Sequence, residues 1–475
     1  MKKLYVSLII CVFVLTANAQ HLSTQNFMRY NPYFNVDNPA HHTPYKGYIG
    51  FPALSSFNVS LSSTFLRYDK IIRFDNEGYP IAMNTEQLLG LLSKKNNWFN
   101  FSLNEEILGF GFRTGPVFFS FSTRTRVDQY FQFSEDLLKL PILGNMSFVG
   151  DNNPADISAN ISLDAYQEFS LGVQVEVNKK LYVGARPKLL IGIAKIRTDE
   201  LNAKIYTNPT DYTMTIDYNA DLSIVSSMPM IWQGDSLYID KQGITSAGKA
   251  MENLGFSIDL GAVYRINDKM GVGLSLLDLG FIQWKTNGVR LRSSLDDAGS
   301  FYNNGSFIFN GLTANQIALF LNDAESREEF LDSLSHYFPV NVQNISGERI
   351  SLTTRLGAEF YYQLNEKHRF TAYFMGTFLG KNFHPQFSLA YNGKLAKVLD
   401  VCAHYTMRPN SFANFGIGLG FDVKPFYLYF GTDNIIAAFA RFKADLISFQ
   451  LGLVFKWGKV KEKRIKELPK EETKI

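Results

Sequence analysis

The chain contains one tetrapeptide that resembles a catalytic motif, Gly-Asp-Ser-Leu at residues 234–237. In one class of esterases the serine of this tetrapeptide is the nucleophile, and a histidine must lie within hydrogen-bond reach to accept its proton. Those enzymes carry the histidine in an Asp-x-x-His pattern near the C-terminus. The candidate pairs here are one residue too long: Asp400 with His404, and Asp332 with His336. We therefore predict a Gly-Asp turn at residues 234–237, and no enzyme.

Metal and nucleotide motifs are equally incomplete. His41 and His42 lie near His21, but only Asp37 stands beside them as a further ligand at suitable spacing, so we expect an exposed N-terminal loop there. The Gly-x-Gly runs never complete Gly-x-Gly-x-x-Gly before a helix, and on strands they would make room for interior side chains. The sequence thus predicts no metal site and no cofactor.

Charged residues recur at alternate positions of apolar segments. If these segments are strands of a closed barrel, the charged side chains face its lumen. The lumen-lining candidates are Arg124, Arg126, Asp128, Arg186, Lys188, Asp259, Arg265, Asp278, Arg355 and Glu359. They could line a polar passage, or they could pair with one another and fill the interior as a static network. We favour the static network, because small barrels are often filled by side chains.

The elements that carry these residues alternate apolar and polar positions, which is the pattern of half-buried strands. The alternation is clear in residues 169–177, 256–266, 352–364, 415–423 and 447–457. Each is long enough to cross a membrane, for which ~9–11 residues suffice. In residues 270–278 the register would place Asp278 in lipid, and we expect a bulge near Leu276 and Leu277 to turn it inward.

Short turns and long polar segments separate the strands. The short turns are Asn178-Lys179-Lys180, Asn267-Asp268-Lys269, Asn365-Glu366-Lys367 and Lys424-Pro425. Asparagine tolerates the left-handed backbone angles that tight hairpins require. Short turns at one end and long loops at the other are typical of outer-membrane barrels. We predict an all-β protein, a transmembrane antiparallel barrel of about 14 strands, within a range of roughly 12–16.

Three stretches favour helix over strand: residues 84–92, 134–140 and 313–337. Asn84 with Gln87, Thr313 with Gln316 and Ser326 with Glu329 have the spacing of capping boxes. These short helices pack on loops or plug the lumen.

The N-terminus has the pattern of a secretory signal peptide. Lys2 and Lys3 precede an apolar run over residues 4–16, and Ala17-Asn18-Ala19 is a small-x-small cleavage site. The run is too short for a spanning helix, and a lipoprotein reading at Cys11 would cut it in half. We therefore expect export to the outer membrane with cleavage after Ala19. The predicted divisions are 1–19 signal peptide, 20–55 N-terminal periplasmic or plug segment, 56–458 barrel and 459–475 charged disordered tail.

Composition agrees with a barrel and gives no sign of nucleic-acid binding. Aromatic residues make up 15% of the 475 residues and charged residues 19%, while the net charge is only +3. A nearly neutral chain lacks the basic footprint of a nucleic-acid-binding protein. The mean hydropathy of −0.08 is that of a chain whose lipid-facing residues are diluted by lumen-facing ones. The expected partners are outer-membrane lipid and periplasmic or surface proteins.

Several motifs together resemble one family of outer-membrane barrels, known as domain of unknown function 5723. They are Asn-Leu-Gly-Phe at 253–256, Asp-Leu-Gly at 259–261, Leu-Asp-Leu-Gly-Phe-Ile at 277–282, Asn-Pro-Ala at 38–40, Tyr-Ile-Gly-Phe-Pro at 48–52 and Gly-Thr-Asp-Asn at 431–434. The family is distantly similar to long-chain fatty-acid transporters and to barrels associated with the type IX secretion system. The resemblance implies a barrel and an outer-membrane address, but no activity. A charged tail after the aromatic end at Phe455 and Trp457 departs from the usual terminal strand.

Three functions remain open. The first is a passive channel or transporter for small or hydrophobic ligands, and an open lumen or a lateral gap would favour it. The second is a non-conducting scaffold or adaptor of a secretion or surface assembly. A sealed lumen with a large exposed patch on the loops would favour it. An outer-membrane esterase is the least favoured, because the histidine pattern is missing.

Overall fold

The chain folds as a closed antiparallel β-barrel of 14 strands in the computed structural model, which confirms the predicted fold class and strand number. The structure describes residues 24–65, 72–74, 80–82, 87, 89–94, 97–210, 212, 214–227, 230–233, 236–239, 251–285, 288–293, 340–379, 382–408, 411–436 and 446–460. Among these residues, no helix is long and apolar enough to cross a membrane.

The wall of the barrel follows the order of the chain. Its strands are β1 (Tyr45–Gly50) continued by β2 (Ser56–Ser63), β5 (Asn97–Thr114), β6 (Val117–Phe133), β8 (Ala159–Glu176), β9 (Leu181–Thr207), β13 (Leu254–Arg265), β14 (Met270–Trp284), β18 (Thr354–Gln363), β19 (His368–Leu379), β20 (Asn382–Lys394), β21 (Leu399–Arg408), β22 (Ser411–Val423), β23 (Phe426–Thr432) and β24 (Leu446–Lys459). β24 pairs with both β1 and β2, for example Ile49 with Phe455 and Leu61 with Ile447. This pairing of the first and last strands leaves no free edge in lipid, where unpaired backbone groups could not be solvated.

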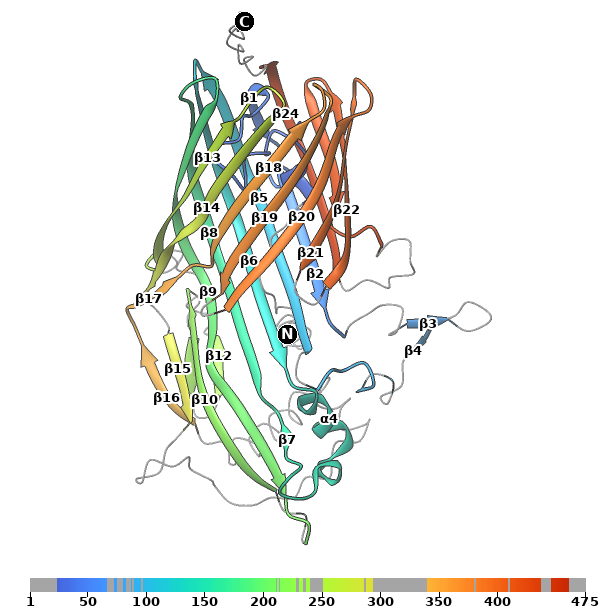
Figure 1. The fold of residues 1–475 in the computed structure, drawn as a ribbon. Helices are drawn as coiled ribbons and strands as arrows, with labels where there is room; N and C mark the ends of the chain where they lie inside the picture. The colour runs from blue at the N-terminus through green and yellow to red at the C-terminus, as the bar shows by residue number, and fades with distance from the viewer. Residues whose placement is uncertain are drawn as a thin grey trace, which may run out of the picture.

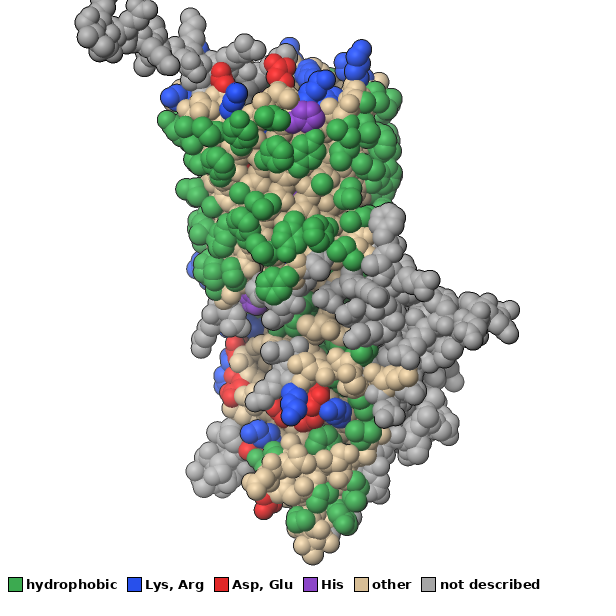
Figure 2. Space-filling model, turned by 45° about the vertical axis from the view of Figure 1, so that its right-hand side comes forward, with side chains coloured by type: hydrophobic (Ala, Val, Ile, Leu, Met, Phe, Trp, Pro, Cys, Tyr) green, Lys and Arg blue, Asp and Glu red, His purple; other side chains and the backbone are tan. Residues whose placement is uncertain are grey.

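An apolar belt covers the outside of the barrel at the end where β24 finishes (Figure 2). Side chains such as Leu171, Val173 and Leu419 are exposed on it, whereas their strand neighbours Ser170 and Gln174 are buried inside. The alternation of the sequence therefore becomes the two faces of the wall, one apolar and one polar. The wall begins at Tyr45, within the stretch 20–55 that was expected to precede it.

Three of the hairpin turns at this end contain an asparagine that caps the backbone. Asn178 Oδ1 accepts hydrogen bonds from the N–H groups of Lys180 and Leu181 at 2.8 and 2.9 Å. Asn267 and Asn365 do the same in the turns that follow β13 and β18. None of these asparagines is among the described residues with positive φ, so the expected left-handed backbone is wrong. Their role is the side-chain cap of an Asx-turn.

The barrel sheet continues beyond the wall at the opposite end (Figure 1). β9 continues far beyond the apolar belt and pairs there with β10 (Met214–Ser226), which pairs with β15 (Gly288–Ser293) and through it with β16 (Val340–Ile345). β17 (Glu348–Ser351) joins this end to β14, and the short β7 (Ala155–Asp156) pairs with β9. Arg290 donates hydrogen bonds to Asp221 across β10 and β15, which lowers the pKa of that carboxyl group.

The remaining elements are short. α4 (Asp136–Leu143) lies in the connection from β6 to β8, where a helix over residues 134–140 was predicted. It is followed by the 3-10 helix η2 (Asn145–Phe148). Two small hairpins stand outside the barrel sheet, β3 (Ile72–Phe74) with β4 (Pro80–Ala82) and β11 (Met230–Gln233) with β12 (Ser236–Ile239). The helix predicted over 313–337 lies outside the described residues, as do the signal peptide and residues 461–475. Of residues 84–92, only 87 and 89–92 are described.

Candidate functional site in the barrel lumen

Residues 24–44 lie inside the barrel and are buried almost throughout; we call them the lumen segment. It opens with the 3-10 helix η1 (Thr24–Phe27), whose residues are all buried. At this end the Thr24 side chain contacts His404 and Asp433 at 2.9 and 2.8 Å. Further along, Arg186 donates to the carbonyl oxygens of Asn35 and Val36 at 2.5 and 2.9 Å. The segment is thus anchored to opposite parts of the wall by hydrogen bonds.

Glycines on the inner face of the wall give the lumen segment its room. A Cβ atom on Gly184 would collide with the carbonyl group of Pro39, and one on Gly261 would collide with the Asn38 side chain and come close to Pro39. Gly418 similarly faces Met28 and Thr24. In the Gly-x-Gly runs, a Cβ on Gly273 would likewise meet the Glu359 side chain and one on Gly111 the Phe118 ring, so these runs make room for interior side chains, as the sequence predicted.

The His41 side chain is one of the anchors. Its Nε2 lies 2.6 Å from Glu359 Oε1, and its ring stacks on Phe34 with 4.3 Å between ring centroids. His41 is buried, so the expected exposed N-terminal loop is wrong at this position. The reason is that the chain turns into the lumen, where Glu359 on β18 meets the imidazole.

Five cations and four carboxylates form a buried network across β5, β6, β8, β9, β13, β14 and β18; we call it the central charge cluster. Its members are Arg124, Arg126, Arg186, Lys188, Arg355, Glu106, Glu168, Asp259 and Asp278. Asp278 is shared by three cations, with Lys188, Arg126 and Arg355 at 2.7, 3.1 and 2.5 Å. Lys188 is in turn 2.8 Å from Asp259 and 3.4 Å from Glu168. Buried ions need such partners, because an unpaired charge there would be costly.

A bulge in β14 brings Asp278 into this cluster. The pairing with β13 shifts from Ile258–Leu279 to Leu260–Leu276, so Asp259 faces two residues instead of one. Asp278 has a φ of 56° and donates its N–H to Asp259 Oδ1 at 2.8 Å. This irregularity lies where the alternation of the sequence breaks, and it turns a residue that would face lipid into the lumen.

The structure gathers seven of the ten lumen candidates in the central charge cluster and places three elsewhere. Asp128 accepts a hydrogen bond from Ser102 at 2.7 Å, Glu359 holds His41, and Arg265 pairs with Asp268 at 3.1 Å near the hairpin turns. Sequence reasoning missed Glu168 and Glu106. Extending the alternation of residues 169–177 back by one position would have found Glu168. Glu106 was hidden, because the register of β5 shifts at this point.

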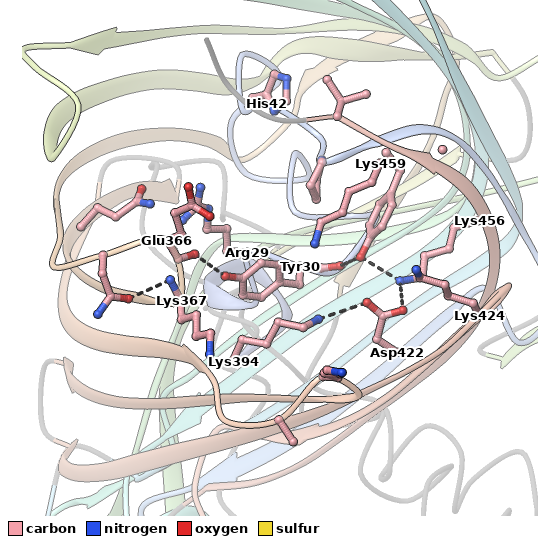
Figure 3. A pocket seen from close by; sticks show the side chains of 18 of the residues that line it. Arg29, Tyr30, His42, Glu366, Lys367, Lys394, Asp422, Lys424, Lys456 and Lys459 are labelled. Carbon is pink, nitrogen blue, oxygen red and sulfur yellow. Dashed lines mark hydrogen bonds and ion pairs between the residues drawn. The ribbon is translucent and has the colours of Figure 1, made fainter. Parts of the chain in front are cut away.

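Between the lumen segment and the ring of hairpin turns lies a cavity of about 1240 Å³ that we call the vestibule. The lumen segment contributes Arg29, Tyr30 and His42 to its lining, and the turns contribute lysines (Figure 3). Lys394 and Lys456 both point to Asp422, at 3.1 and 2.6 Å. The Tyr30 hydroxyl donates a hydrogen bond to the carbonyl oxygen of Glu366 at 2.9 Å, which connects the lumen segment to the turn between β18 and β19.

The Gly-Asp-Ser-Leu tetrapeptide falls on the small β11–β12 hairpin outside the barrel sheet. Gln233 pairs with Ser236 across the β11–β12 hairpin, and Gly234 and Asp235 between them lie outside the described residues. No group of three or more His, Cys, Asp or Glu in the described residues is arranged to hold a metal ion.

Comparison with known proteins identifies the family. Residues 39–433 match the family of unknown function DUF5723. No curated protein matches the chain. Among solved structures, the toluene transporter TodX of Pseudomonas putida is similar over 93% of this chain and 98% of its own, with 9% identity and a TM-score of 0.41. The toluene transporter TbuX of Ralstonia pickettii covers 94% of this chain and 100% of its own, with 10% identity and a TM-score of 0.40. A FadL homologue of Pseudomonas aeruginosa covers 93% and 98%, with 9% identity and a TM-score of 0.41.

Proposed function

The chain belongs to the DUF5723 family, and we propose that it is an outer-membrane barrel that passes small solutes when its lumen segment moves aside. The observation that carries the proposal is the way the lumen is closed. The plug is a separate stretch of chain, residues 24–44, and not a layer of wall side chains alone. A segment that belongs to no strand can move without breaking the backbone pairing of the wall.

The orientation follows from the two ends of the barrel. Hairpin turns such as 177–180, 266–269 and 364–367 connect the strands at one end, while the extended sheet and the longer connections stand at the other. In outer-membrane barrels the short turns face the periplasm. We therefore propose that the vestibule opens to the periplasm and that the β9–β10–β15–β16 sheet stands outside the cell.

The chemistry of the inner face supports small polar or amphipathic solutes better than purely apolar ones. Tyrosines contribute both an aromatic ring and a hydroxyl group to this face, and several are buried there beside the lumen segment: Tyr48, Tyr182, Tyr361, Tyr373, Tyr427 and Tyr429. Between them lie the paired ions of the central charge cluster. An apolar ligand would have to desolvate these groups without offering them hydrogen bonds.

A second candidate is a non-conducting adaptor. It is favoured by the sheet beyond the belt, which has a hydrophobic core of its own around Ile205, Met214 and Tyr218 and is far larger than a loop needs to be. The lumen segment would then be a permanent part of the interior. The two candidates differ in one respect that can be measured, which is whether the segment leaves the lumen.

The proposal is tested by wedging the lumen segment out of its seat. In the Gly184→Ala/Gly261→Ala variant, each new methyl group collides with the lumen segment. The methyl group at Gly184 collides with the backbone of Pro39, which is rigid. Gly172→Ala is the control, because its methyl group collides with the Ser120 side chain on the same inner face and reaches Arg186 only at an ordinary contact distance of 3.8 Å. We expect the wedged variant to open in planar bilayers at least about tenfold more often than the wild type, and the control to match the wild type. Destabilising the closed state relative to the open state by about 1.4 kcal/mol gives this factor.

Folding of each variant is checked by its shift in gel mobility on heating. A folded wedged variant that is as silent as the wild type and the control would contradict the channel and leave the adaptor. Equal opening of all three proteins would show a path that does not involve the lumen segment.

A further inference from the structure

We propose that the vestibule is a docking site for an acidic peptide segment of a partner protein. The inference concerns a site that solute passage does not require, and it holds whether or not the barrel conducts. If the barrel has the orientation proposed above, this partner is periplasmic.

The charge of the vestibule is strongly unbalanced. Its lining contains nine lysine or arginine residues and three aspartate or glutamate residues. The chain as a whole is nearly neutral, with a net charge of +3, so the excess of cations is local. A concave surface of one sign concentrates ligands of the opposite sign and speeds their association.

Two of the three carboxylates of the vestibule are already engaged by the protein itself. Asp422 lies between Lys394 and Lys456, and Asp268 pairs with Arg265 at 3.1 Å. The lysines around the opening, by contrast, are exposed: Lys269, Lys367, Lys397 and Lys424 lie in turns, and Lys459 ends β24. The acidic residues of the vestibule therefore leave most of the positive charge around its opening available to a ligand.

One cation deeper in the vestibule adds a second observation. Arg29 of the lumen segment has a buried Nη1 atom without a hydrogen-bond partner in the described structure. Its guanidinium group lies beside the Tyr30 ring, 5.8 Å from the ring centroid. A carboxylate that enters the vestibule would satisfy this donor, and bidentate pairing with carboxylates is what the guanidinium fork favours.

The shape of the site favours a peptide over lipid headgroups. Inner-leaflet headgroups surround the barrel on the outside, whereas the vestibule lies within the ring of turns and continues to the lumen segment (Figure 3). Its lining also includes Leu364, Trp457 and Val460, which would contact the apolar parts of a peptide. A volume of about 1240 Å³ exceeds the ~300–1000 Å³ that a small molecule needs.

The experiment measures binding of a short fluorescein-labelled polyglutamate peptide to the purified full-length protein by fluorescence anisotropy. The vestibule variant is Lys367→Glu/Lys424→Glu. The matched control is Lys179→Glu/Lys180→Glu, which reverses two exposed lysines of a hairpin turn at the same end but outside the vestibule lining. We expect the vestibule variant to bind at least about tenfold more weakly than the wild type, and the control to change the affinity by less than about threefold.

Three outcomes would overturn the proposal. Equal weakening in both variants would show a general effect of charge at this end of the barrel. A labelled polyglutamine peptide that binds as well as polyglutamate would show that the acidic groups do not matter. Native mass spectrometry reports the lipids retained by each protein. If the vestibule variant alone loses phosphatidylglycerol while its peptide affinity equals that of the wild type, the surface binds lipid headgroups.

Discussion

At the scale of single residues, the interior of the barrel depends on charges that satisfy one another. Asp278 is 2% exposed and is shared by Arg126, Lys188 and Arg355. The alternation of the sequence placed most of these charges on the inner face. It could not show which would meet, because the partners lie on strands far apart in the chain. Lys188 on β9 and Asp278 on β14, for example, are separated by 90 positions.

Neutralising Asp278 should therefore destabilise the barrel strongly. Asn can adopt the positive φ of this position and has nearly the same shape, so Asp278→Asn removes the charge and leaves the backbone unstrained. Three buried cations then lose a shared anion, and we expect the free energy of unfolding to fall by about 3–5 kcal/mol. The measurement is the urea midpoint of the heat-dependent gel shift.

Asp199→Asn is the control for this variant. Asp199 pairs with Arg197 at 2.9 Å on the surface, where its side chain is 37% exposed. An exposed pair of this kind contributes about 0–1 kcal/mol. If both variants unfold at the same urea concentration, the central charge cluster does not stabilise the barrel.

At the scale of elements, strand periodicity predicted most of the wall and missed what lies beyond it. Residues 169–177, 256–266 and 415–423 became parts of β8, β13 and β22 with the expected faces. The sequence did not predict that β9 continues to Thr207. Beyond the apolar belt β9 pairs with β10 and β7, and its outer face no longer contacts lipid, so the alternation of apolar and polar residues changes there. β1 was missed, because the six residues of Tyr45–Gly50 are too short for a convincing alternation and are separated from β2 by residues 51–55.

The two faces of a strand should respond differently to a charge. Leu171 of β8 is 60% exposed on the apolar belt, well away from the hairpin turn. We expect Leu171→Arg to make folding into the membrane less favourable by about 2–4 kcal/mol, which is the cost of an arginine near the bilayer midplane. The assay is urea-dependent folding into liposomes.

Leu395→Arg serves as the comparison. Leu395 is also 60% exposed but lies in the turn between β20 and β21, beyond the strands. Its replacement should change the free energy of folding by less than about 0.5 kcal/mol. Equal effects at the two positions would mean that the belt does not face lipid.

At the scale of the whole molecule, the protein combines a closed wall, the lumen segment inside it and a basic vestibule between that segment and the hairpin turns. The sequence indicated that residues 20–55 could be a plug, yet it could not place them. Their contacts are to the glycines, carbonyl groups and charges of distant strands, such as Gly184, Ala262 and Glu359. None of these contacts leaves a local pattern in the sequence. The vestibule was not predicted for the same reason, because it exists only when the turns form a ring.

The most direct test of the central claim ties the lumen segment to the wall and measures solute flux. In the Asn38→Cys/Gly261→Cys variant the two thiols face each other, since a Cβ on Gly261 would contact the Asn38 side chain. Cys402, buried in the core, is replaced by alanine in this variant and in its parent. Proteoliposomes are loaded with a small sugar, and its efflux is followed before and after reduction of the disulfide. We expect the reduced form to release the sugar at least as fast as the parent, because the side chain added at Gly261 also presses on the lumen segment. In the oxidised form we expect efflux at least about tenfold slower than in the reduced form. Equal efflux in both forms, or none in either form or in the parent, would contradict the central claim.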